Sequence, residues 1–217
     1  VCGAVWFGGT YKDKSNFFAR SATDDNFFEL YPEFSISPND FEKYKNLSPD
    51  ELIKAGVLPD VQGIYNDDKI LIDALLISHA HQDHWGLYNY INPAIKCYLG
   101  RATKKLIEIN NLFTSKNTII GNPKYFEKEQ AFQIGDITVT AYWADHSAFD
   151  SYSFLIEAKG KSIFYSGDFR GHGRKSKVFR WFTHNAPQNV DYLLLEGTSL
   201  GRDSKPFKSE NDIEDEL

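Results

Sequence analysis

Residues 79–84 carry the side chains in this sequence that are best suited to bind a metal ion. The segment reads His-Ala-His-Gln-Asp-His, which places three histidines and one carboxylate within six residues. Imidazole nitrogens and carboxylate oxygens are ligands that zinc accepts in proteins. The alternative is a polar loop that is rich in histidine by chance. The position of the segment, directly after a hydrophobic run, favours a metal site.

The hydrophobic run at residues 69–78 is the element that must position this cluster. It is rich in Ile and Leu, and we expect a strand that is buried on both faces. On a turn that leaves such a strand, His79 and His81 can point into one pocket. Asp83 and His84, at the start of the next helix, would then point toward a second pocket.

This pattern resembles the signature of the metallo-β-lactamase superfamily, in which His-x-His-x-Asp-His follows a hydrophobic strand. Two later strand ends continue the resemblance in the same order. His146 resembles the histidine of the family's third motif, and Asp168 resembles its bridging aspartate. A single histidine at a strand end is more often structural, so the order of all three motifs carries the resemblance. It implies an α+β fold, the αββα sandwich of this superfamily.

The resemblance also implies two zinc ions and a set of six ligands. They are His79, His81 and His146 for the first ion, Asp83 and His84 for the second, and Asp168 as the bridge. Two such cations lower the pKa of a bridging water, which attacks as hydroxide, and they stabilise charge on the substrate. Asp83 is also expected to act in catalysis.

Other residues near the motifs are expected to support the ligands. Gly167 would allow the backbone before Asp168 to pass close to the metals. The outer ring nitrogens of the histidines need acceptors, and Asp73 and Asp145 are candidates. An ordinary surface or turn role fits each of these two aspartates equally well.

Residues 196–198, Glu-Gly-Thr, follow an expected buried strand at 190–195 and narrow the substrate class. They resemble the first motif of the β-CASP branch, the nucleic-acid-cutting branch that includes ribonuclease J and the mRNA 3′-end processing factor. The resemblance makes Glu196 a catalytic residue near the metals, where it orients a ligand histidine. A strand-terminal glutamate followed by a glycine turn is the alternative.

A basic segment follows Asp168 and offers candidates for substrate binding. Five positive charges occur within eleven residues, at Arg170, Arg174, Lys175, Lys177 and Arg180. Such a cluster could hold phosphates without reading base sequence, and a solvated helix surface is the alternative. The expected substrate-binding residues are Arg170, His172, Arg174 and Lys175. His184 is expected to be structural.

Composition sets the broad class of the protein. The chain has 217 residues, of which 41% are hydrophobic, which suits one large domain or part of a larger one. A formal charge of −6 argues against a surface that is basic throughout. Two cysteines without metal-type spacing, and no apolar run near the roughly 18 residues that span a membrane, lead us to expect a cytoplasmic protein without a membrane partner.

Two features of the family have no counterpart in the sequence. No Asp-x-Gly turn precedes Lys69, and no histidine follows His184 to complete the second metal site. The chain also begins at Val1 and contains no methionine. We therefore expect residues 1–200 to be the N-terminal portion of a metallo-β-lactamase domain that lacks its C-terminal portion. Residues 201–217 would be a linker or the start of an inserted β-CASP-type domain.

Three functional hypotheses follow from these features. The leading one is a zinc-dependent ribonuclease, or more broadly a phosphodiesterase that acts on RNA, although this stretch alone need not be active. The second is a small-molecule hydrolase of the same fold that cleaves a lactone, a thioester or a cyclic phosphodiester. The third is an inactive scaffold, which the intact ligand cluster disfavours.

Overall fold

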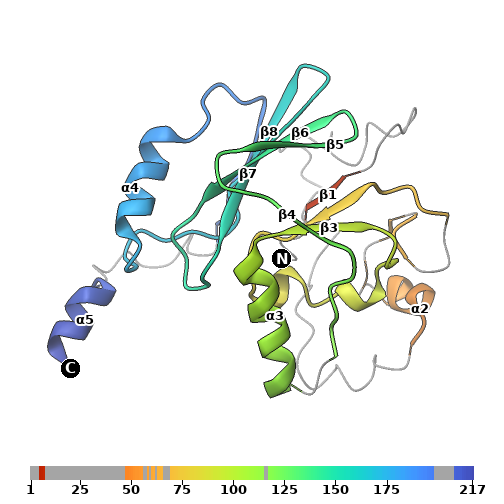
Figure 1. The fold of residues 1–217 in the computed structure, drawn as a ribbon, viewed down its shortest axis with the longest axis horizontal. Coiled ribbons are helices and arrows are strands. Elements are labelled where there is room, and N and C mark those ends of the chain that lie inside the picture. The colour runs from red at the N-terminus through yellow and green to blue at the C-terminus, as the bar shows by residue number, and fades with distance from the viewer. Residues whose placement is uncertain are drawn as a thin grey trace.

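The computed structural model describes residues 5–7, 47–55, 58, 60–61, 63–65, 69–114, 117–197 and 208–217. Within these residues, two β-sheets pack face to face, and helices cover the outer faces (Figure 1). The α+β sandwich expected from the sequence is therefore confirmed. Among the described residues, no helix combines the length and the apolar character that crossing a bilayer requires.

The first sheet has the strand order β1-β2-β3-β4. Its strands are β1 (Val5–Phe7), β2 (Ala74–Leu76), β3 (Lys96–Leu99) and β4 (Pro123–Tyr125). β1 is antiparallel to β2, whereas β2, β3 and β4 are parallel. β2 and β3 are the inner strands of this sheet. The loop that follows β2 therefore starts near the centre of the row of strand ends.

The second sheet has the strand order β5-β6-β7-β8-β9. Its strands are β5 (Ala131–Ile134), β6 (Ile137–Trp143), β7 (Tyr152–Ala158), β8 (Lys161–Tyr165) and β9 (Tyr192–Leu194). The pairs are antiparallel as far as β8, and β9 is parallel to β8. The β7–β8 hairpin turns at Lys159 and Gly160, whose φ angles of 51° and 71° are those of a two-residue turn that matches strand twist.

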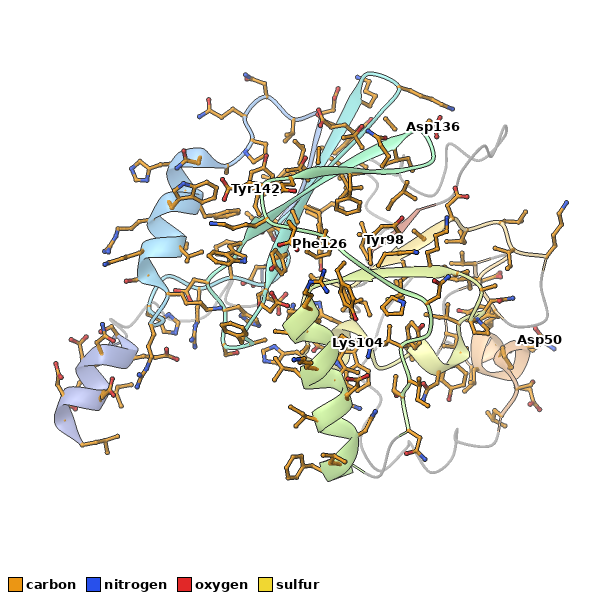
Figure 2. The ribbon with its side chains drawn as sticks, in the orientation of Figure 1. Asp50, Tyr98, Lys104, Phe126, Asp136 and Tyr142 are labelled. Atoms are coloured by element: carbon orange, nitrogen blue, oxygen red, sulfur yellow. The ribbon has the colours of Figure 1, made fainter. Side chains whose placement is uncertain are left out.

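β2 is buried on both faces, as the sequence predicted, although it is shorter than residues 69–78. Leu75 packs in a cluster with helix residues on the outer face, and Leu76 packs in the cluster between the sheets. Figure 2 shows Tyr98 and Phe126 in this inter-sheet layer, and each of their rings stacks with that of Phe132, at centroid distances of 5.2 and 5.7 Å.

Four α-helices are described: α2 (Pro49–Lys54), α3 (Arg101–Thr114), α4 (Ser176–Asn185) and α5 (Glu210–Glu216). Ser48 caps α2 and Ser209 caps α5, each in a reciprocal capping box with the residue three positions on. The α-helix expected to start at Asp83 and His84 is not found: two 3₁₀ turns, η2 (Gln82–His84) and η3 (Tyr88–Tyr90), occupy this region.

α4 covers the outer face of the second sheet. The Trp181 ring stacks on Tyr142 of β6 at 6.4 Å, and the Phe182 ring lies 5.8 Å from Phe164 of β8. Figure 2 shows Tyr142 on the side of the sheet that faces α4. With α2 and α3 on the other side, the layers are helix, sheet, sheet and helix.

The expectation of a buried strand at 190–195 is wrong about burial. β9 forms there, but its three side chains are 44–56% exposed. Within the part of the chain that the structure describes, β9 is the edge strand of its sheet and pairs with β8 alone. The apolar residues at 192–194 therefore form an edge strand in the described structure and not a core strand.

Candidate metal centre

The metal-ligand candidates lie just beyond the C-terminal ends of β2, β6 and β8. His79, His81 and His84 follow β2, His146 follows β6, and Asp168 follows β8. The loops meet because the two sheets are joined at this edge: the Tyr152 amide of β7 donates to the Ser78 carbonyl at 3.1 Å. Residues that are 89 positions apart in sequence thus reach one site.

Three histidine nitrogens converge at the first group. His81 Nδ1 lies 3.1 Å from His79 Nε2 and 2.9 Å from His146 Nε2. Zinc–nitrogen bonds of 2.0–2.1 Å in a tetrahedral site place ligand nitrogens about 3.3 Å apart. Lone pairs this close repel one another unless a proton or a cation lies between them, so the arrangement fits a metal ion.

A second group shares His79 and adds His84 and Asp168. Asp168 Oδ2 lies 3.4 Å from His84 Nε2, 3.9 Å from His79 Nε2 and 3.7 Å from His146 Nε2. In each group the potential ligand atoms lie within 4.8 Å of one another. The Asp168 carboxylate therefore stands between the two groups, at the position expected of a bridging ligand.

Asp83 differs from the other expected ligands. Its Oδ2 atom lies 3.5 Å from His84 Nε2, yet its side chain is 63% exposed and it belongs to neither compact group. The structure thus brings five of the six expected ligands together and leaves Asp83 at the solvent-facing rim.

The electrostatics favour the protonation states that bind metal. Burial, followed by the neighbouring His84 and His146, lowers the pKa of His79 to about 2. Burial, followed by His81, lowers the pKa of His146 to about 4. A hydrogen bond from His84 is the main reason that the pKa of Asp168 is lowered. Neutral imidazoles and an ionised carboxylate are the forms that bind metal ions.

Ser78 is a site residue that the sequence reasoning missed. Its buried hydroxyl lies 3.1 Å from His79 Nδ1 and 3.3 Å from His84 Nδ1, so one side chain fixes both rings with Nε2 toward the site. The sequence offers Asp73 and Asp145 as candidates for this role, but Asp73 is exposed and the Asp145 carboxylate faces Arg170. The sequence signal for Ser78 is small: a hydroxyl at the end of an otherwise apolar strand.

Gly167 and Glu196 shape the loop that carries Asp168. Gly167 has a φ of +56°, and a Cβ atom there would lie 2.6 Å from the Tyr152 carbonyl oxygen, so only glycine fits. Glu196 Oε1 accepts a hydrogen bond from the Phe169 amide at 3.1 Å. Glu196 therefore anchors the backbone next to Asp168. The third residue of its motif, Thr198, lies outside the described residues.

The four expected substrate-binding residues do not join the metal groups. Arg170 Nη2 pairs with Glu210 Oε1 at 2.7 Å, and Arg174 Nη2 pairs with Glu214 Oε2 at 2.9 Å, both on α5. His172 is exposed, and its backbone carbonyl accepts a hydrogen bond from the Glu210 amide. Lys175 Nζ donates a hydrogen bond to the Ala148 carbonyl, beside the His146 loop.

The other basic side chains of this segment lie on α4. Lys177 and Arg180 are exposed there. His184 is exposed as well, and its Nδ1 atom lies 2.6 Å from the Arg180 carbonyl oxygen. This contact within one helix agrees with a structural role for His184.

Comparison with known proteins adds independent information. The model of a family described as "Beta-lactamase superfamily domain" matches residues 62–211. A ribonuclease J from Sinorhizobium meliloti is 25% identical over 116 residues, which are 52% of this chain and 20% of that protein. A ribonuclease J from Mycoplasma genitalium is 25% identical over 161 residues, which are 71% of this chain and 28% of that protein. The chain thus spans less than a third of these relatives.

A solved structure supports the fold. A protein of unknown function from Enterococcus faecalis V583 superposes with a TM-score of 0.66 at 24% identity, covering 77% of this chain and 45% of that one. At this identity the likeness concerns the fold alone.

Proposed function

The chain belongs to the β-lactamase superfamily domain family, as its motifs predicted, and from this premise we propose that it is part of a zinc-dependent nuclease that hydrolyses phosphodiester bonds in RNA. The observation that carries the metal-dependent chemistry is the convergence of His79, His81 and His146 beside the Asp168 carboxylate. The choice of RNA is supported by the similarity to two ribonuclease J proteins. Because both relatives are much longer, the activity of the whole protein is part of the proposal.

The ligand set divides between two zinc ions. His79, His81 and His146 would hold one, His84 and Asp83 would hold the other, and Asp168 would contact both. When bound, the ions lower the pKa of a water molecule and neutralise negative charge that develops on the substrate.

The chain's own side chains would keep this site in order during the reaction. Ser78 holds the rings of His79 and His84 in place through their Nδ1 atoms. Glu196 fixes the backbone after Asp168. Asp83, exposed at the rim next to His84, is placed to take up a proton from an attacking water, and this is its proposed catalytic role.

The loop after His146 offers a surface for RNA. Phe149 is 68% exposed and lies three residues from His146. Asp150 anchors the loop, because its carboxylate accepts hydrogen bonds from the Thr103 amide at 2.8 Å and the Tyr152 hydroxyl at 2.7 Å. An exposed aromatic ring on a fixed loop suits stacking with a nucleobase, and Lys175 beside this loop could contact a phosphate.

The relatives' greater length also bears on domain organisation. We propose that residues 1–200 are the N-terminal portion of a metallo-β-lactamase domain, and that residues 201–217 are a linker or the start of an inserted domain. α5 is the described element of that second segment.

A small-molecule hydrolase is the second candidate, and one observation favours it. Arg170 and Arg174 are paired with carboxylates of α5, which reduces the cationic surface available to an RNA strand. A lactone or thioester substrate would need no such surface.

The test is cleavage of single-stranded RNA and of a lactone or thioester by the zinc-loaded protein. We expect RNA cleavage that is lost in His81→Ala and Asp168→Ala and kept in Asp136→Ala, which alters an exposed hairpin turn away from the site (Figure 2). Stoichiometric zinc together with ester hydrolysis, but no RNA cleavage, would overturn the nuclease proposal in favour of the second candidate.

A further inference from the structure

Arg170 connects the two loops that carry His146 and Asp168. Its backbone amide donates to the Asp145 carbonyl at 2.7 Å, and its Nε atom lies 3.8 Å from Asp145 Oδ1. Asp145 directly precedes His146, and Arg170 follows Asp168 by two residues. One residue thus fixes the spacing between two ligand-bearing strand ends.

The Asp145 carboxylate depends on this arginine. Asp145 is 1% exposed, and neither of its carboxylate oxygens has a hydrogen-bond partner among the described residues. A Cβ atom at Gly173 would lie 2.6 Å from both Arg170 Nε and Asp145 Oδ1, so the glycine is what lets the two groups approach. A buried carboxylate without hydrogen bonds needs a nearby cation. Burial raises the pKa of Asp145, and the nearby positive charges of Arg170 and Lys175 oppose this increase.

The same guanidinium also reaches α5. Arg170 Nη2 pairs with Glu210 Oε1 at 2.7 Å. The other Glu210 carboxylate oxygen accepts a hydrogen bond from the Arg174 amide at 2.9 Å. The Glu210 amide donates a hydrogen bond to the His172 carbonyl at 3.0 Å. Glu210 is therefore bonded to the loop that follows Asp168 through its side chain and through its backbone.

We propose that Arg170 is a positioning residue that couples metal binding to the docking of α5. Docked α5 holds the guanidinium against Asp145, which sets the distance between the His146 and Asp168 loops. By thermodynamic reciprocity, metal bound at the site strengthens the docking of α5 as much as docked α5 strengthens metal binding. The inference rests on the metal site of the proposed function and is independent of RNA as its substrate.

A direct phosphate-binding role for Arg170 makes a different prediction. The guanidinium already spans Asp145 and Glu210, so a phosphate would have to displace one of these carboxylates. Removing the charge of Glu210 would then free Arg170 and strengthen RNA binding while leaving zinc affinity unchanged. The coupling role predicts weaker zinc binding instead.

The test compares Glu210→Gln with Glu216→Gln. The control removes a carboxylate from the same helix, where it pairs with Lys208 instead of the loop. We expect Glu210→Gln to weaken zinc binding about 3- to 10-fold in a chelator competition, less than the 10- to 100-fold typical of groups that touch metal ligands directly. In the unaltered protein and in the control, zinc should slow hydrogen exchange of α5 amides, and in Glu210→Gln it should not.

A second variant separates positioning from general stability. Arg170→Lys keeps a positive charge near Asp145 but cannot reach both carboxylates as the guanidinium does. With Co²⁺ in place of zinc, its visible absorption spectrum should differ from that of the unaltered protein, because ligand geometry has changed, whereas mere destabilisation leaves the spectrum of the folded protein unchanged.

The outcomes distinguish this inference from the proposed function. Equal zinc affinity, cobalt spectra and α5 exchange in Glu210→Gln, Arg170→Lys and the control would overturn the coupling. If zinc binding and α5 exchange respond to these variants as expected but the protein cleaves no RNA, the nuclease proposal is wrong and the coupling proposal stands.

Discussion

The candidate metal centre and strand β9 invert the usual distribution of side chains. At the metal centre, Ser78, His79 and His84 are fully or almost fully buried although they are polar. In β9, Leu193 and Leu194 are about half exposed although they are apolar. Buried polar groups cost free energy unless they are paired or bind a metal, and exposed leucines contribute little to stability. The ligand loops are therefore held by the residues packed around them, whereas β9 depends mainly on its hydrogen-bond ladder with β8.

The strongest test of this contrast is removal of ligands. Asp168 would contact both ions and His81 the first alone, so Asp168→Ala should lose both zinc ions and His81→Ala should keep one at reduced affinity. A loss of more than about 100-fold in affinity is expected for each direct ligand that is removed. Zinc content after dialysis measures the effect, and identical zinc content in the two variants would contradict the two-group geometry.

The second test is the pH dependence of the metal-free protein. The pKa of His146 is 6.5 in the unfolded chain and about 4 in the folded protein. Between these pH values, His146 therefore binds a proton in the unfolded chain but not in the folded protein. The free energy of unfolding is therefore unaffected by protonation of His146 above pH 6.5 and decreases as the pH falls from 6.5 to 4. The loss is about 3 kcal/mol for a shift of this size.

Urea unfolding at pH 7 and pH 4.5 measures this dependence. His146→Ala should lose less stability over this interval than the unaltered protein does. His184→Ala, on the exposed face of α4, should behave like the unaltered protein. An unchanged pH dependence in His146→Ala would show that His146 is not shielded from protons.

The third test concerns the close approach beneath the metal loop. Gly167 and Gly160 both have positive φ, but a Cβ atom at Gly160 meets nothing within 4 Å, whereas at Gly167 it would meet the Tyr152 carbonyl. Gly160→Ala should therefore cost about 1 kcal/mol of unfolding free energy, from backbone strain alone. Gly167→Ala should cost about 3 kcal/mol. Equal costs in thermal or urea unfolding would mean that the crowding at Gly167 is relieved without penalty.

The smallest effect is expected in β9. Leu193→Ala should change the unfolding free energy by about 0.5 kcal/mol or less, because the side chain is already half exposed. Leu76→Ala, which opens a cavity between the sheets, should cost about 2–5 kcal/mol. Comparable losses in urea unfolding would show that β9 is covered in solution.

The ligand cluster could be predicted from the sequence because its chemistry is local. Residues 79–84 hold their ligand types within one turn after a strand, and the order of the later motifs located His146 and Asp168. The helix caps are local in the same way, since Ser48 and Ser209 need only the residues that follow them to cap a helix.

The remaining features depend on contacts between distant segments. The η2 turn is what brings His84 close to the Ser78 hydroxyl. Arg170 and Arg174 form ion pairs with carboxylates of α5, about 40 positions away in sequence. The prediction that β9 is buried was wrong for the described residues, because an apolar sequence run does not reveal whether a strand lies at the edge of a sheet or inside it.

Anomalous diffraction from crystals of the zinc-loaded protein tests the central claim most directly. We predict one zinc peak within bonding distance of His79 Nε2, His81 Nδ1 and His146 Nε2, and a second peak beside His84 Nε2, with Asp168 Oδ2 between them. Zinc peaks elsewhere on the chain, with none among these histidines, would contradict it.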